Sequence, residues 1–193
     1  MKSVARTAGA RPGAGRARMA PAIDIMVDSP LWKAQRGVKA VLRRAIGEAA
    51  AMTAMSGGKA AALAATRGGE LAIVLTDDSA IRALNRDWRG KDQPTNVLSF
   101  PAPALGATPS GKPASIRLIG DIVIAYETVE REALAEHRPF RHHLAHLAVH
   151  GFLHLVGHDH AAEAEADAME ALEIAVLARL DVPNPYRTRD AEA

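Results

Sequence analysis

The sequence predicts an α+β fold, in which a small mixed β-sheet packs against helices. Segments of strand length and segments with helical periodicity follow one another in the order β-α-β-α-β-β-α-α-α. Because the last three segments are all helical, helices are expected to cover the sheet. A cluster of histidines on the middle one of these three helices, and on the turn after it, marks a predicted metal site.

The N-terminal third predicts a basic tail, one strand and one helix. Residues 1–20 contain five basic residues and no acidic residue, and we expect them to be a disordered extension. The segment 23–27 alternates apolar and polar residues, which predicts a strand. Pro30 then opens a predicted helix over 31–52, whose apolar residues fall on one stripe. The glycine-rich segment 53–69 predicts a loop.

The middle of the chain predicts a buried strand, a short helix and a charged loop. Residues 71–75 form a continuous apolar run, as expected for a strand that is covered on both faces. Asp77 or Asp78 is placed to cap a short helix that ends near Asn85. The polar segment 85–94 is dense in charge and predicts a loop.

The C-terminal half predicts two strands and three helices. A short strand over 95–100 is followed by a Pro-, Ala- and Gly-rich segment, 101–115, which predicts a flexible insertion. The second strand, 116–124, is interrupted at Gly120, where glycine suggests a bulge or a close approach of backbones. Helical patterns then cover residues 128–136, 140–156 and 162–180.

Composition limits the class of protein. A chain of 193 residues can bury a real core, and we expect a single domain over residues 21–187 with a short tail at 188–193. The absence of cysteine excludes disulfides, Cys-ligated zinc and a thiol nucleophile. No apolar run has membrane-spanning length, and the N-terminus lacks a signal-peptide core. A cytoplasmic protein with no membrane partner is therefore expected.

The net charge of +2 arises from the N-terminal tail. Five of the 24 basic residues lie in residues 1–20, so the remainder of the chain carries 19 basic residues against 22 acidic ones. The tail is thus the part of the chain that is suited to a non-specific electrostatic contact with nucleic acid.

The segment HGFLHLVGHDH, residues 150–160, has the spacing of a catalytic metal site. His150 and His154 are four residues apart, which places both imidazoles on one face of a helix. Gly157 can take the left-handed conformation that ends a helix, so that the chain turns and brings His160 toward the other two. Three neutral imidazoles that leave a position for water are the pattern of a catalytic zinc centre.

The same order of residues occurs in the zinc proteases that carry HExxHxxGxxH, so the site is predicted to be zincin-like. Those enzymes have a glutamate after the first histidine as their general base, whereas this chain has Gly151. The chain therefore has the ligand set of a zinc hydrolase without the base of the protease. A metallopeptidase in which Asp159 or another acid replaces that glutamate remains an alternative.

Three segments together resemble the YbeY family of bacterial endoribonucleases, also called rRNA maturation factors. They are LNRDWR with KDQPTNVLSFP (84–89 and 91–101), GDI (120–122) and the histidine segment (150–160). The resemblance covers roughly residues 70–187. It implies a catalytic domain that cleaves single-stranded RNA with zinc, in small-subunit rRNA maturation and ribosome quality control. RNA, the small ribosomal subunit and assembly factors are the partners it implies.

Residue by residue, the resemblance implies that His150, His154 and His160 bind one zinc ion per chain. Arg89 falls at the arginine that lines the catalytic cleft in the family. A planar guanidinium binds two phosphate oxygens at once, so Arg89 suits a site where charge builds on a phosphate. The candidate catalytic residues are therefore Arg89 and Asp159.

Several of these residues keep a second interpretation. Arg89 could instead form a surface ion pair with Asp87 or Asp92, and Asp159 could orient a ligand histidine or cap the following helix. Trp88 could stack on a base or belong to the core.

The zinc site itself also has a second interpretation. A non-enzymatic ribosome-assembly factor with structural zinc would need a fourth protein ligand, for which His146 and His158 are the candidates.

Overall fold

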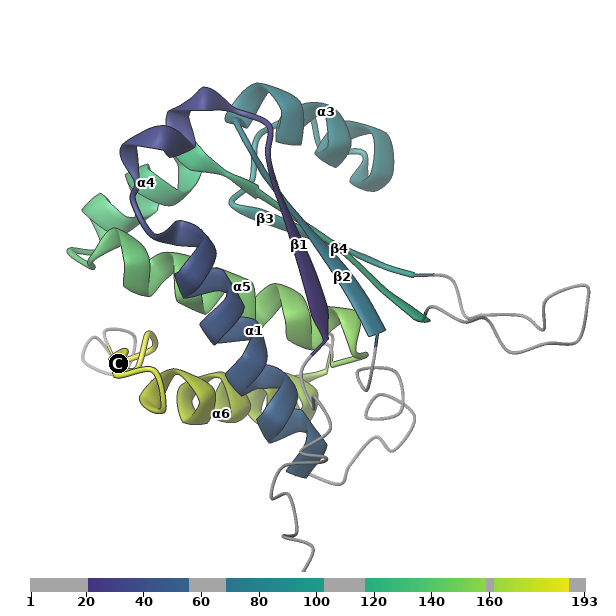
Figure 1. The fold of residues 1–193 in the computed structure, drawn as a ribbon, viewed down its shortest axis with the longest axis vertical. Coiled ribbons are helices and arrows are strands. Elements are labelled where there is room, and N and C mark those ends of the chain that lie inside the picture. Colours follow the sequence, from purple (N-terminus) through teal and green to yellow (C-terminus); the bar gives the residue numbers. More distant parts are fainter. Residues whose placement is uncertain (1–20, 56–68, 103–116, 159–161, 188–193) are drawn as a thin grey trace, which may run out of the picture.

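The computed structural model describes residues 21–55, 69–102, 117–158 and 162–187. In these ranges the chain has the predicted α+β architecture (Figure 1). In chain order, its elements are β1 (Ala22–Val27), the 3-10 helix η1 (Pro30–Ala34), α1 (Val38–Met55), β2 (Gly69–Thr76), α3 (Asp78–Arg89), β3 (Val97–Pro101), β4 (Arg117–Ala125), α4 (Tyr126–Ala135), α5 (Phe140–Leu155) and α6 (Glu163–Ala178).

The four strands form one mixed sheet in the order β1-β2-β4-β3. β1, β2 and β4 are parallel, and β3 pairs antiparallel with β4 as an edge strand. The prediction of a small mixed sheet is confirmed. β2 lies inside the sheet and carries side chains into packed layers on both faces, as its continuous apolar sequence predicted.

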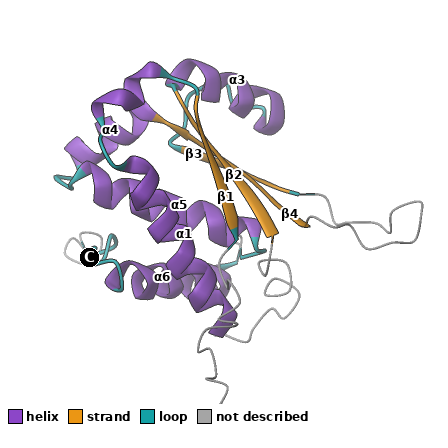
Figure 2. Ribbon diagram, viewed as in Figure 1, coloured by secondary structure: helices purple, strands orange, loops and turns teal. Residues whose placement is uncertain are grey.

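Helices cover both faces of the sheet (Figure 2). α5 packs against β3 and β4 on one face and against α1, α4 and α6, while α3 packs on β4 from the other face. The larger apolar core lies between the sheet, α1 and α5, and a smaller one under α3 contains Ile81, Leu98 and Val123. α6 lies on α5 and α1, so α5 is the central helix of its layer.

The predicted helix over 31–52 is divided in two. Pro30 opens the short helix η1, and Gly37 then takes a positive φ of 79° before α1 begins at Val38. The break lets Trp32 turn into the core, where the ring is 2% exposed and its Nε1 donates to the Thr76 carbonyl oxygen. Burying this indole with its N–H satisfied fixes the start of α1 against the sheet.

α3 is longer than predicted, because it continues through the expected loop to Arg89. Asp77 is its N-cap and accepts a hydrogen bond from Ala80 N, as the sequence allowed. The helix ends where Gly90 takes the left-handed conformation, with φ of 70°. Arg89 therefore lies in the last turn of a helix rather than in a loop. The core interpretation of Trp88 is wrong, since this residue is 72% exposed.

β4 has the irregularity that Gly120 predicted. The register between β2 and β4 shifts between Glu70 and Leu71, and Gly120 has φ of 144°. A Cβ atom at Gly120 would lie 2.3 Å from the Phe100 carbonyl oxygen, which is closer than atoms can pack. Glycine is required here because β3 and β4 approach each other too closely for any side chain.

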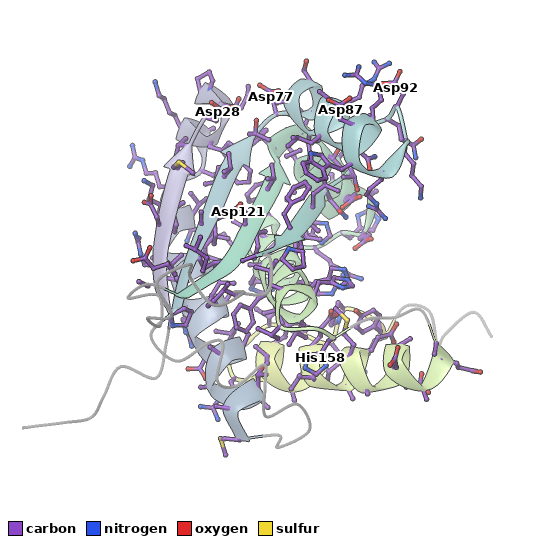
Figure 3. All side chains as sticks on the ribbon, turned by 90° about the vertical axis from the view of Figure 1, so that its right-hand side faces the viewer. Asp28, Asp77, Asp87, Asp92, Asp121 and His158 are labelled. Atoms are coloured by element: carbon purple, nitrogen blue, oxygen red, sulfur yellow. The ribbon has the colours of Figure 1, made fainter. Side chains whose placement is uncertain are left out.

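Figure 3 shows Asp87 and Asp92 around α3 in the upper part of the view, and His158 lower down near α6. The predicted tails (1–20 and 188–193) and nearly all of the predicted insertion over 101–115 lie outside the described residues. Among the helices of the described ranges, none has the length and apolar character needed to cross a bilayer.

Candidate functional site

The two predicted ligand histidines in the described part of the chain lie on α5 with their rings converging. His150 and His154 are one turn apart on the helix, and their Nε2 atoms are 3.1 Å from each other. The two rings meet edge to face, with 4.6 Å between their centroids. The i, i+4 spacing thus produces the convergence that the sequence predicted.

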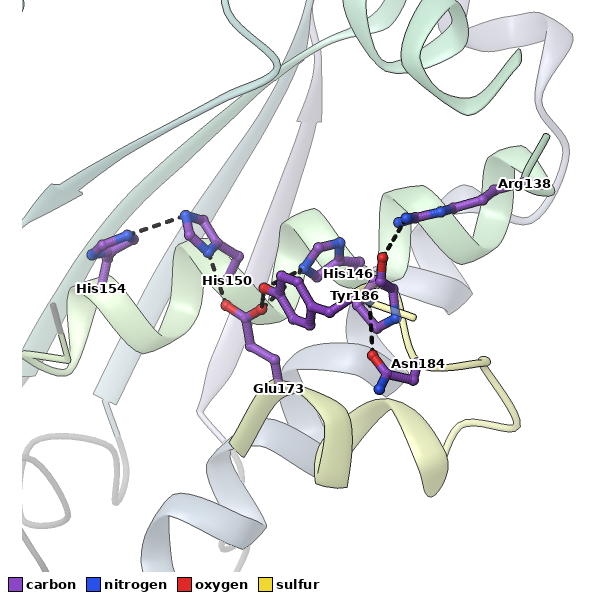
Figure 4. A network of polar contacts seen from close by, with 8 residues as sticks. Arg138, His146, His150, His154, Glu173, Asn184 and Tyr186 are labelled. Atoms are coloured by element: carbon purple, nitrogen blue, oxygen red, sulfur yellow. Dashed lines mark hydrogen bonds and ion pairs between the residues drawn. The ribbon is translucent and has the colours of Figure 1, made fainter. Parts of the chain in front are cut away.

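The other ring nitrogen of each histidine is committed to an oxygen acceptor. His150 Nδ1 lies 2.8 Å from a carboxylate oxygen of Glu173 (Figure 4). His154 Nδ1 lies 3.1 Å from the carbonyl oxygen of His158. Since a carbonyl oxygen only accepts, His154 Nδ1 carries the proton, and the carboxylate imposes the same tautomer on His150. In the neutral rings, both Nε2 atoms then present lone pairs.

Two lone pairs that face each other across 3.1 Å repel unless a proton or a metal ion lies between them. Two imidazole ligands of one tetrahedral zinc ion, each at the usual bond length, would have their nitrogens about 3.3 Å apart. The donor set and its spacing therefore fit a shared metal ion. Holding a ligand histidine through its remote N–H is also the usual way in which metal sites fix the ring and its tautomer.

Glu173 of α6 is a site residue that the sequence interpretation missed. Its side chain is 1% exposed, and its carboxylate is 2.8 Å from His150 Nδ1 and 3.0 Å from His146 Nε2. The hydroxyl of Tyr186 donates to the same carboxylate (Figure 4). Tyr186 is positioned in turn by Asn184, whose side-chain oxygen accepts from the Tyr186 backbone N–H.

These contacts keep Glu173 ionised. Burial alone would raise the pKa of its carboxyl, but hydrogen bonds from His146 and His150 outweigh burial and lower the pKa to about 2. Glu173 is therefore a carboxylate at neutral pH, able to accept the proton-bearing nitrogens that face it. A negative carboxylate behind an imidazole also makes the opposite nitrogen a better metal ligand.

A second carboxylate, on α4, pairs with a different histidine of α5. Glu132 lies 2.8 Å from His143 Nε2 and accepts a hydrogen bond from the Asn96 side chain. Burial opposes ionisation, yet these two hydrogen bonds lower the pKa of Glu132. Asn96 Oδ1 also accepts a hydrogen bond from the backbone N–H of Val97.

Gly151 brings α5 close to the sheet. A Cβ atom there would lie 3.0 Å from Ser99 Oγ and 3.2 Å from a methyl carbon of Ile122, and Ser99 Oγ donates to the Gly151 carbonyl oxygen. The position that holds the general base in the HExxH proteases thus faces β3 and β4, where even a Cβ atom would be in tight contact with two side chains. This contact argues against the peptidase alternative for a steric reason.

Arg89 reaches the histidine pair from α3. A pocket of about 470 Å³ is lined by Arg89, His150 and His154, together with Ser99 of the edge strand β3 and with His158. Neither Asp87 nor Asp92 pairs with Arg89, because Asp87 binds Arg86 and Asp92 binds Arg82. Within the described ranges Arg89 forms no ion pair, so its exposed guanidinium is available to an anion in this pocket.

Comparison with known proteins identifies the family of this fold and site. The family described as Endoribonuclease YbeY matches residues 34–181. The chain belongs to the YbeY family. It is 50% identical to the Endoribonuclease YbeY of Nitrobacter hamburgensis over 90% of this chain and 86% of that protein. It is 52% identical to that of Rhodopseudomonas palustris strain BisA53, over 88% of this chain and 92% of the relative.

A solution structure of a Thermotoga maritima protein is also similar, at 20% identity and a TM-score of 0.45, over 89% of this chain and 95% of the other. The YbeY family membership makes the chain an endoribonuclease, a hydrolase that acts on RNA.

The segments that resemble YbeY proteins meet around the pocket. Residues 84–101 contribute the end of α3 and all of β3, Gly120 pairs with β3, and the histidine segment begins in the last turns of α5. Two predicted site residues are not among the residues that the structure describes, namely Asp159 and the third expected ligand, His160. Among described side chains, no three His, Asp or Glu groups converge as a complete metal site.

His146 and His158, the two candidates for a fourth zinc ligand, make different contacts from each other. His146 Nε2 faces Glu173 and the Tyr186 hydroxyl, so this ring supports the site from behind rather than joining the histidine pair. His158 lines the pocket, and its carbonyl oxygen accepts a hydrogen bond from His154 Nδ1. Nothing in the position of His146 supports a closed, four-ligand structural zinc site of the kind a non-enzymatic factor would need.

A larger pocket of about 830 Å³ lies on the other side of His150. Its wall carries four glutamates, and the guanidinium of its arginine, Arg138, already contacts Glu136 and the Pro185 carbonyl oxygen. Carboxylates repel phosphates, so the phosphate of an RNA substrate is expected in the smaller pocket, at Arg89.

Proposed function

We propose that this YbeY protein cleaves single-stranded RNA with one zinc ion bound by His150, His154 and His160. The observation that carries the proposal is the pair of Nε2 atoms 3.1 Å apart, each with its Nδ1 held by an oxygen acceptor. When bound, zinc supplies Lewis-acid chemistry, since it lowers the pKa of a water molecule and polarises a phosphoryl oxygen.

The remaining roles belong to the side chains of the protein. Arg89 binds the phosphate and neutralises the charge that develops on it, because its guanidinium is unpaired within the described ranges and lines the same pocket. Glu173 and the His158 carbonyl oxygen hold the ligand rings in one tautomer. Asp159, next to His160 in the sequence, is proposed to orient a ligand histidine.

Small-subunit rRNA is the proposed substrate, and ribosome quality control in the cytoplasm is the proposed setting. The small ribosomal subunit and its assembly factors are the corresponding partners. This part of the proposal is supported by the YbeY family membership and by the motif segments that resemble the family.

Replacing Glu173 by glutamine is expected to weaken zinc binding by about tenfold to a hundredfold, the usual cost of losing a carboxylate behind a metal ligand. Glutamine has the same shape but no charge, and its amide nitrogen cannot accept the second imidazole N–H. The measurement is competition for zinc with a chromophoric chelator. Glu170→Gln is the matched control, because Glu170 lies on the same helix and lines the larger pocket. Equal zinc affinity in both variants would exclude the proposed role of Glu173.

The substrate class is tested with one oligoribonucleotide presented in two forms. The zinc-loaded protein is expected to cut it when single-stranded and to leave it intact when it is annealed to its complement. Adding EDTA should stop cleavage, and excess zinc should restore it. Cleavage of the duplex at the same rate, or undiminished cleavage in EDTA, would refute the proposed function.

A further inference from the structure

Trp88 is largely exposed, whereas every other tryptophan, tyrosine and phenylalanine of the chain is buried or partly buried. Trp88 is 72% exposed, whereas Trp32, the other tryptophan of the sequence, is 2% exposed. An indole that stays in water forgoes one of the largest apolar contributions a side chain can make to stability. Tryptophan is enriched at binding interfaces relative to the rest of a protein surface, whereas leucine is under-represented among the residues that dominate binding.

The Trp88 ring is held by a second aromatic residue. Its centroid is 5.6 Å from that of Phe100 on β3, with 66° between the ring planes, so the two rings meet in a T-shaped contact. Phe100 is itself partly buried against the small core under α3. Phe100 thereby supports the indole, while most of Trp88 remains exposed to solvent.

Both aromatic residues are neighbours in sequence of residues that line the Arg89 pocket. Trp88 directly precedes Arg89 at the end of α3, and Phe100 lies between Ser99 and Pro101, which line that pocket. Along the edge strand β3, Ser99 points toward α5 whereas Phe100 points toward α3, so the histidine pair and the aromatic rings lie on the two sides of this strand. A polymer that crosses the sheet edge with a phosphate at Arg89 would bring its neighbouring unit to the aromatic pair.

The charged residues near Trp88 and Phe100 indicate which kind of partner these rings could bind. From Arg82 to Lys91 the chain has four basic residues and one acidic residue. The two arginines that precede Trp88 on α3 are paired, but Arg89 forms no ion pair within the described part of the protein. A basic surface that continues into an aromatic one fits a chain of phosphates and bases rather than an apolar protein surface.

We propose that Trp88, supported by Phe100, is a stacking platform for a nucleobase of single-stranded RNA whose adjacent phosphate lies at Arg89. The proposal rests on the proposed function of the Arg89 pocket and extends it to a subsite for the base. A base in a duplex already stacks on its neighbours, so only an unstacked base can use the platform. Trp88 thereby favours single-stranded substrates.

Intrinsic fluorescence tests the platform directly, because Trp32 is buried and hydrogen-bonded and Trp88 is the exposed emitter. Mixing the full-length zinc-loaded protein with a single-stranded oligoribonucleotide in a stopped-flow instrument is expected to quench the emission saturably, before turnover. Trp88→Phe should remove the quenching. A duplex of the same sequence should quench little. Unchanged wild-type emission at RNA concentrations that saturate cleavage would overturn the proposal.

Kinetics provide an independent readout. Trp88→Ala is expected to raise KM for single-stranded RNA roughly tenfold, the usual scale for losing one stacked base, while kcat stays within about twofold. Trp88→Phe should recover most of the affinity, since phenylalanine keeps an aromatic face. Leu134→Ala is the matched control, because Leu134 is 71% exposed on α4.

An unchanged KM in Trp88→Ala would refute the platform. Two further results separate this proposal from the proposed function. Saturable quenching with no cleavage under any metal condition would leave the platform standing and remove the nuclease assignment. Normal cleavage without quenching would keep the nuclease assignment and refute the stacking platform.

Discussion

Replacing Arg89 by alanine should lower the rate of single-stranded RNA cleavage by a factor on the order of one hundred or more. Removing one group that stabilises the charge of a transition state usually lowers the rate by about this factor. Arg89 is exposed at the end of α3 and lines the pocket of the histidine pair, so its removal should leave the melting temperature and the zinc content nearly unchanged. Rates must be measured over a saturating substrate series, which separates lost binding from a slower chemical step.

Two further variants sharpen the Arg89 result. Arg89→Lys should recover only part of the rate, because an ammonium group is a point charge without the bidentate fork. Arg86→Ala is the matched control, since Arg86 is exposed on the same helix and pairs with Asp87 away from the pocket. Wild-type turnover by Arg89→Ala would remove Arg89 from the site, and a large loss of melting temperature would make it a structural residue.

Replacing His154 by alanine should abolish zinc binding at micromolar metal and stop RNA cleavage. Removing a group behind a metal ligand typically weakens binding by about tenfold to a hundredfold, and removing the ligand itself should cost more. The fold should persist, because His154 is only partly buried and α5 is anchored by a fully buried apolar face. His142→Ala is the control on the same helix, as His142 does not line the pocket.

The helix over 140–156 and its histidine pair could be predicted because the information is local. The spacing of His150 and His154 is fixed by helix geometry alone, and α5 ends one residue from the predicted boundary. Glu173 escaped prediction because it reaches His150 from another helix, 23 residues later in the chain. One signal was present, since Glu173 lies between Met169 and Val176 on the apolar stripe of its helix. An acidic residue in such a stripe needs a buried partner.

The end of α3 shows a second kind of error. Dense charge from Asn85 onward suggested a loop, but Ile81, Leu84, Asn85 and Trp88 have the i, i+3, i+4, i+7 spacing of one helix face. Gly90 is the residue type that ends helices, and α3 does end there. The correction moves Arg89 into a rigid last turn. The exposure of Trp88 could not be predicted, because it depends on where α3 lies on the sheet.

Zinc titration of metal-free protein tests the central claim most directly, namely that the histidine pair of α5 is part of the catalytic metal site. Cleavage of single-stranded RNA by the wild-type protein should be absent without metal, rise in proportion to added zinc and level off at one ion per chain, as expected for a single three-histidine site. The His154→Ala protein, titrated in parallel, should neither retain the ion nor gain activity. Full cleavage by the metal-free wild-type protein, or equal zinc retention by His154→Ala, would contradict the account.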